Sequence, residues 1–265
     1  MNRVALITGA SAGIGAAFAR VFAEHGFDLV LAARREDRLR SLAAELERAH
    51  GIRAHVFPLD LADREAVARF CAELAAANVT VDALVNNAGY GVPGSFGSVP
   101  WQRHADFLQV LLVSLTELTY RLLPGMVDRG YGRIINVASL AGLLPAPAGH
   151  TLYAATKSFV IRFSEALSCE VSSRGVHVTA VCPGFTYSEF HDVTGTRAMM
   201  RGLPSWMWMD APTVARQGYD AVMAGRPVYV NGRVNTAIAV LARYLPQRLV
   251  HAMNRRVGRS YRDAQ

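Results

Sequence analysis

Cysteine is scarce in this chain of 265 residues, and its three cysteines (Cys71, Cys169 and Cys182) stand far apart. Such a set predicts neither a disulfide framework nor a metal-ligand cluster, so we expect no metal site and a reducing, cytoplasmic setting. Charged residues make up only 18% of the chain against 51% hydrophobic ones, which argues against disorder and favours a compact domain. No uninterrupted apolar run approaches the roughly 20 residues that span a bilayer. The first residues enter a strand pattern at once, which leaves no room for a signal peptide.

Lysine is rarer still, because Lys157 is the only lysine among 28 basic residues. It follows Tyr153 by four positions, a spacing that puts both side chains on one face of a helix. An ammonium beside a phenol lowers the phenol pKa from about 10 toward neutrality, which makes Tyr153 a candidate proton donor and acceptor. Taken alone, the spacing is a weak signal, and it more often reflects a buried tyrosine and a solvated lysine that share a helix.

The net charge of +7 is concentrated near the C-terminus. A basic tail with apolar spacing is typical of a solvated helix face, and it also allows weak contact with an anionic membrane surface. No zinc-finger or RNA-binding signature is present, so we expect no nucleic-acid partner. The tail carries one acid, Asp263, against these arginines: Arg243, Arg248, Arg255, Arg256, Arg259 and Arg262.

Short β-branched runs alternate with helical patterns along the chain, which predicts an α/β fold. The strands are almost continuously apolar, as in parallel sheets covered by helices on both faces. We therefore expect a single doubly wound Rossmann-type domain over residues 1–232, with a substrate lid at about 185–210 that is rich in Met and Trp. A basic helical extension is expected over 233–265. The predicted sheet has about seven strands: Val4–Thr8, Leu29–Ala33, His55–Leu59, Ala83–Asn86, Arg133–Ala138, Val176–Val181 and Val228–Asn231.

The first predicted strand runs directly into a glycine-rich turn and then a helix. Glycines there permit a tight turn and let backbone amides approach a diphosphate at the helix N-terminus. The second strand ends at Ala33, where an NAD site would need a carboxylate, and Arg34 and Arg35 follow at once. Arginines in that place suit a 2′-phosphate, which favours NADP over NAD.

Further polar or glycine-bearing motifs follow the later strands, each at a predicted carboxyl end. Any one of them could be a turn or a cap. Chance does not readily explain why all of them occur together in this order. They are Asp60-Leu61, Asn86-Asn87-Ala88-Gly89, Ser139, and Pro183-Gly184 with Ser188 four residues beyond.

Together these motifs resemble the short-chain dehydrogenase/reductase family over about residues 3 to 232. The resemblance implies that Ser139, Tyr153 and Lys157 are catalytic and that NADP(H) is the cofactor. By the same resemblance Arg34 would select NADPH, and Ser188 would replace the usual threonine of the family. The implied cofactor-binding residues are Gly9, Ser11, Gly13, Ile14, Gly15, Arg34, Arg35, Asp60, Leu61, Asn87, Ala88, Gly89, Tyr153, Lys157, Pro183, Gly184 and Ser188.

One position departs from the family pattern, because Leu111 stands where the family has a catalytic asparagine. We expect an NADPH-dependent oxidoreductase acting on a carbonyl or alcohol of a small, lipophilic molecule, with slower proton resupply. The alternative is a catalytically weak or inactive NADP-binding sensor or scaffold. The resemblance also implies a homodimer or homotetramer.

Overall fold

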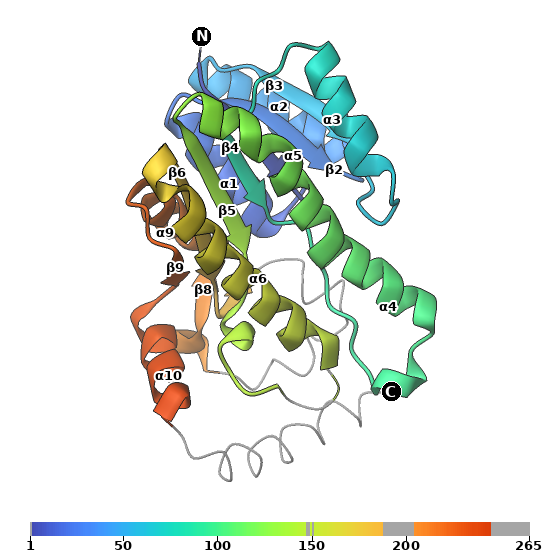
Figure 1. Cartoon of the computed structure of the whole chain (residues 1–265), viewed down its shortest axis with the longest axis vertical. Helices are drawn as coiled ribbons and strands as arrows, with labels where there is room; N and C mark the ends of the chain where they lie inside the picture. The colour runs from blue at the N-terminus through green and yellow to red at the C-terminus, as the bar shows by residue number, and fades with distance from the viewer. Residues whose placement is uncertain (1, 147–148, 150, 188–203, 245–265) are drawn as a thin grey trace.

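Seven parallel strands form the central sheet in the order β3-β2-β1-β4-β5-β6-β9. The computed structural model describes residues 2–146, 149, 151–187 and 204–244 (Figure 1). Chain order runs outward from β1 on one side and from β4 on the other, so the strand order reverses between these two strands. Open α/β sheets bind ligands at such a point, beyond the carboxyl ends of the strands. The strands are β1 Val4–Thr8, β2 Asp28–Ala33, β3 Ala54–Pro58, β4 Ala83–Asn86, β5 Gly132–Val137, β6 Val176–Cys182 and β9 Val228–Val230.

Helices cover both faces of this sheet, as the uniformly apolar strands predicted. Successive strand residues point to opposite faces, so Ala5 and Ile7 pack under α1, α2 and α9, whereas Leu6 packs under α3, α5 and α6. The predicted doubly wound fold is confirmed. The helices are α1 Gly13–Glu24, α2 Glu36–His50, α3 Ala66–Ala76, α4 Trp101–Leu108, α5 Ser114–Asp128, α6 Thr151–Val171, α9 Ala211–Met223 and α10 Arg233–Tyr244.

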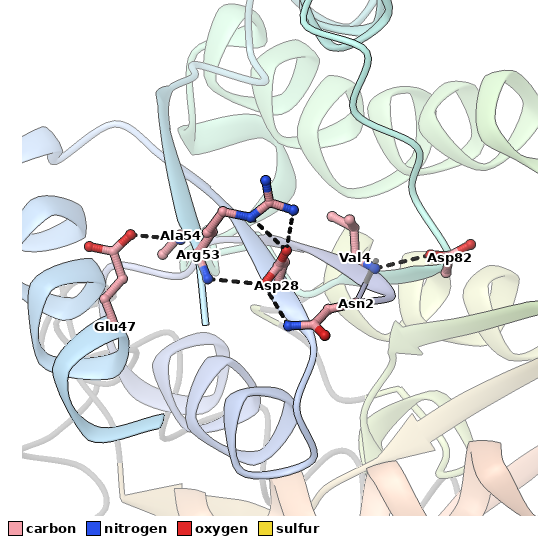
Figure 2. Close-up of polar contacts among 7 residues, drawn as sticks. All are labelled: Asn2, Val4, Asp28, Glu47, Arg53, Ala54 and Asp82. Carbon is pink, nitrogen blue, oxygen red and sulfur yellow. Dashed lines mark hydrogen bonds and ion pairs between the residues drawn. The ribbon is translucent and has the colours of Figure 1, made fainter. Parts of the chain in front are cut away.

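Carboxylates close the amino edge of the sheet (Figure 2). Asp28 is buried, and its oxygens accept hydrogen bonds from the Arg53 backbone N–H at 3.0 Å and from the Arg53 guanidinium at 2.8 and 3.0 Å. Asp82 accepts from the Val4 N–H in the same way. Burial alone would raise the pKa of Asp28, but the hydrogen bonds from Arg53 and Asn2 outweigh it and hold the pKa below its ordinary value. Backbone N–H groups at the starts of the strands are thus hydrogen-bonded by carboxylate side chains, and these carboxylates lie far from the carboxyl edge.

The segment Trp101–Asp128 is long and apolar enough to cross a membrane by length and composition. Its apolar content is dispersed, which is why the sequence shows no uninterrupted run. Phe107, Leu118 and Met126 are fully buried against the sheet, as in a core helix. Between α4 and α5 the segment passes through a π-helical turn, Gln109–Val113 (η2), which contains Leu111.

Part of the predicted lid folds as a second, two-stranded parallel sheet. Strand β7 (Phe185–Tyr187) leaves directly after Pro183-Gly184 and pairs with β8 (Trp208–Asp210). The Trp208 ring lies 4.8 Å from the Tyr187 ring and 5.6 Å from the Phe185 ring. The rest of the lid prediction, residues 188–203, falls outside the described residues, and so does the tail prediction beyond Tyr244.

Candidate active site

The glycine-rich turn between β1 and α1 is closed so tightly that a side chain is excluded at Gly9 and at Gly15. A Cβ added to Gly15 would lie 2.3 Å from the Gly9 carbonyl oxygen, and Gly9 has a φ of +66°. The Gly9 N–H donates to the Ala32 carbonyl oxygen at 2.8 Å, which ties the turn to the end of β2. Helix α1 has no side-chain cap at Ala12 and no acid in its first turn. The positive end of this helix is therefore free for a diphosphate.

Thr8 and Asn87 brace this turn against the end of β4. The Asn87 side-chain amide donates to the Thr8 and Gly9 carbonyl oxygens at 2.9 and 3.3 Å. In return, the Thr8 hydroxyl oxygen accepts from the backbone N–H groups of Asn87 and Ala88 at 3.0 and 3.1 Å. The predicted residues Gly9, Gly15, Asn87 and Ala88 thus belong to one rigid unit. Thr8 joins them, although the sequence interpretation assigned it no role.

Two arginines stand at the end of β2, where the carboxylate of an NAD site is missing. Arg35 donates through Nε and Nη2 to the Ser11 hydroxyl oxygen at 3.2 and 3.1 Å, so its guanidinium lies over the glycine-rich turn. Arg34 is exposed beside it. With Ala33 in place of an acid, this arrangement suits a dinucleotide that carries a 2′-phosphate.

Asp60 and Leu61 follow β3 at the same edge of the sheet. Asp60 is exposed and its carboxylate accepts from the Ala62 N–H, which shapes the turn. Leu61 is buried, and its carbonyl oxygen accepts from the Ser114 hydroxyl at 2.8 Å. The Gln109 amide in turn donates to Ser114. This chain of bonds links Leu61, one of the predicted cofactor-binding residues, to the π-helical turn.

Ser139 follows β5 and caps a 3₁₀ turn, Leu140–Gly142 (η3). Its hydroxyl oxygen accepts from the Ala141 N–H at 3.1 Å, so the hydroxyl hydrogen remains available for another acceptor. The adjoining Leu140 N–H donates to the Pro183 carbonyl oxygen at 2.9 Å, which joins η3 to the end of β6. A Cβ on Gly142 would lie 2.6 Å from the Lys157 carbonyl carbon. The serine turn and α6 therefore meet backbone to backbone.

Tyr153 and Lys157 share one face of α6, as their spacing predicted. The Lys157 Nζ lies 5.8 Å from the centre of the Tyr153 ring and donates to the Val137 carbonyl oxygen at 2.7 Å. Burial lowers the pKa of Lys157 from 10.5 to about 8. The interpretation of Lys157 as a solvated surface lysine is wrong, because the side chain is held inside the carboxyl edge of the sheet.

Leu111 lies in the π-helical turn and is only 2% exposed. Its Cγ is 3.6 Å from the place a Cβ on Gly89 would take. Leu111 belongs to the same apolar cluster that Tyr90, Leu152 and Tyr153 pack against. The position where the family has an amide is thus a buried apolar side chain of that cluster.

A family model described as short chain dehydrogenase matches residues 3–197.

The chain belongs to the short-chain dehydrogenase family.

Relatives of known name agree with this placement. Sulfoacetaldehyde reductase 2 of Chromohalobacter salexigens is 39% identical over 192 residues, covering 72% of this chain and 75% of the relative. The very-long-chain 3-oxoacyl-CoA reductase of Homo sapiens is 35% identical over 185 residues, covering 68% of this chain and 58% of the human protein. Among solved structures, a short-chain dehydrogenase from Sphingobium yanoikuyae in complex with NADPH is 30% identical, with a TM-score of 0.80 over 92% of this chain and 97% of that one.

The structure adds two residues to the predicted site, and one predicted residue lies outside the part of the chain that it describes. Ser188 lies outside the described residues. Gly142 and Cys182 contact the predicted catalytic group without having been singled out for it. Cys182 immediately precedes Pro183-Gly184, and the Gly142 position follows Ser139 by three residues, so proximity to a motif was the only available signal.

Proposed function

We propose that this protein is an NADPH-dependent oxidoreductase that reduces the carbonyl group of a lipophilic small molecule, or oxidises the corresponding alcohol. The observation that carries the proposal is that the turn holding Ser139 packs on α6 at Lys157, whose ammonium lies beside the Tyr153 ring, at the same carboxyl edge of the sheet as the glycine-rich turn. When bound, NADPH supplies the hydride. The relative solved with NADPH supports this choice of cofactor.

The residues of this chain take the remaining roles. Tyr153 donates a proton to the carbonyl oxygen as negative charge develops there, and it accepts that proton in the reverse direction. Ser139 orients the same oxygen through its hydroxyl hydrogen, since its oxygen is already engaged by Ala141. Lys157 places its ammonium beside the tyrosine and favours the phenolate form.

Apolar surroundings support a lipophilic substrate. Leu111 replaces an amide by a hydrocarbon in the apolar cluster that Tyr153 packs against, and Tyr90, Val92 and Leu152 pack against the same cluster. On the lid side, Trp208 stacks on Tyr187. The name of the human relative, a reductase of very-long-chain 3-oxoacyl groups, supports the same class of substrate.

The test is a substrate panel followed by oxidation of NADPH and, in parallel, of NADH. It contains sulfoacetaldehyde, short polar ketones, ring ketones and long-chain 3-oxoacyl thioesters. We expect NADPH-dependent turnover that rises with the apolar size of the substrate. A preference for sulfoacetaldehyde or short polar ketones would remove the lipophilic part of the proposal.

A Tyr153→Phe variant tests the catalytic assignment. We expect turnover to fall at least about a hundredfold, since a general acid contributes that much or more, while NADPH binding is retained. Tyr120→Phe is the control, because Tyr120 is an exposed tyrosine on α5. Comparable activity in both variants would sink the assignment.

The alternative function is an NADP-responsive sensor or scaffold, and the buried Leu111 is the observation that favours it. Tight NADPH binding with no turnover across the panel would support this alternative. A Leu111→Asn variant then separates the two, because a gain of turnover would identify the leucine as the cause. Unchanged turnover of an active enzyme in this variant would show that the leucine does not slow proton resupply.

A further inference from the structure

Helix α10 is anchored to the active-site end of the domain by its first turn. Asn235 is buried, and its amide donates to the Asn231 carbonyl oxygen at 2.7 Å and contacts the Met209 sulfur of β8 at 3.7 Å. A Cβ on Gly184 would lie 2.5 Å from this same amide. The helix is therefore fixed both to the Pro183-Gly184 motif and to the lid strand β8. Figure 1 shows it beside β8 and β9, at the end of the sheet opposite the N-terminus.

The outward face of α10 is an apolar stripe. Val234, Ala237, Leu241 and Tyr244 follow one another at helical spacing along it, and Val240 lies at its border. Leu241 is 66% exposed and Tyr244 is 78% exposed. Side chains of this size at such exposure, gathered on one face, are typical of a surface that has a partner.

The charge around the stripe indicates which partner. Helix α10 contains Arg233 and Arg243 and no acid, and residues 245–265 add five arginines against the single acid Asp263. A second copy of this helix would bring like charges together. An anionic lipid surface instead accepts the apolar stripe among its acyl chains and the arginines among its headgroups.

We propose that α10 docks this protein on anionic lipid bilayers, with its Val234–Tyr244 stripe in the membrane interface and its flanking arginines on the headgroups. The carboxyl edge of the sheet and the β7–β8 lid then lie near the bilayer, because Asn235 of α10 packs against Gly184 at that edge and against Met209 of β8. This inference does not depend on catalysis and would hold for the sensor function as well.

The test is co-sedimentation of the full chain with vesicles of equal parts phosphatidylcholine and phosphatidylglycerol, and with vesicles of phosphatidylcholine alone. We expect binding to the anionic vesicles that weakens as salt is raised. Leu241→Glu should reduce this binding at least about tenfold, since it places a charge in the apolar stripe. Failure of the wild-type chain to sediment with anionic vesicles would overturn the proposal, as would equal sedimentation of Leu241→Glu.

A matched pair of tyrosine variants guards against misfolding. Tyr244 on α10 and Tyr120 on α5 are 78% and 77% exposed, so each can be changed to serine with the same loss of apolar surface. Only Tyr244→Ser should weaken vesicle binding, and NADPH binding should persist in both. Equal vesicle binding by the two variants would contradict the docking role. Light scattering then measures the oligomeric state of the wild-type chain and of Leu241→Glu. A dimer that dissociates in this variant would show that a second copy covers the stripe, which would overturn the proposal.

Discussion

Lys157 on α6 and Cys182 at the end of β6 are buried together beneath Ser139, and the charged form of each favours the charged form of the other. Burial raises the pKa of the Cys182 thiol to about 12, although Lys157 and the Ser139 N–H both act to lower it. Burial also lowers the pKa of Lys157 to about 8. The thiol is therefore neutral over the whole range in which the lysine titrates.

This relationship predicts the alkaline limb of the pH profile. Lys157 is protonated below about pH 8, so kcat/KM for carbonyl reduction should fall as the pH rises through that value. Cys182→Ala should keep the same midpoint, because it removes a group that carries no charge there. A wild-type midpoint near the ordinary lysine value of 10.5, or a midpoint that moves in Cys182→Ala, would contradict this interpretation.

The buried ammonium should also cost stability in the cofactor-free protein. Between about pH 8 and 10.5 the unfolded chain binds more protons at Lys157 than the folded chain, so the free energy of unfolding rises with pH in that window. Lys157→Met should raise the free energy of unfolding near pH 7 by roughly 1–3 kcal/mol, after allowance for the lost bond to Val137, and should raise the melting temperature with it. The gain should shrink near pH 10. Thermal unfolding at both pH values checks this, and an equal gain at both would be evidence against it.

Gly142 is predicted to be essential for the position of Ser139 relative to Lys157, rather than for folding. A Cβ there would lie within 2.8 Å of three backbone atoms of α6, which cannot rotate away, so Gly142→Ala must displace the serine turn from Lys157. Turnover should drop at least about tenfold, since small misplacements of catalytic groups are costly. Gly97→Ala is the control, because a Cβ at Gly97 meets nothing within 4 Å. Similar turnover in both variants would show that η3 tolerates the shift.

The two arginines after β2 should set cofactor preference. Arg34→Ala and Arg35→Ala should each weaken NADPH binding by about tenfold or more, the value of one or two charge-assisted hydrogen bonds, while NADH binding changes little. Arg40→Ala is the control, since Arg40 lies on α2, which begins directly after Arg35, and pairs with Glu36. Fluorescence titration with both dinucleotides measures the effect. Equal losses of affinity for NADPH and NADH would mean that neither arginine contacts the 2′-phosphate of NADPH.

Much of this architecture could be predicted from the sequence. Parallel strands that are buried on both faces appear as apolar runs, and recognisable glycine or polar motifs follow them. The seven strands, the glycine turn and the Tyr153–Lys157 pair were all predicted from such patterns. Strands β7 and β8 were not, since three residues each are too few to show a period. The π-helical turn at Gln109–Val113 is likewise too short to disturb a helical pattern. The contact of Gly142 with Lys157 depends on how two distant segments approach, which local sequence does not encode.

The bond between Arg35 and Ser11 has a thermodynamic consequence. A long arginine side chain normally loses rotamer freedom when it meets a ligand, at a cost of about 0.5–1.5 kcal/mol. Here the guanidinium is already held over the glycine turn by two hydrogen bonds to one hydroxyl. Folding has therefore already restricted the rotamers of Arg35. The binding of a phosphate should then cost less side-chain entropy than it would with a freely rotating arginine.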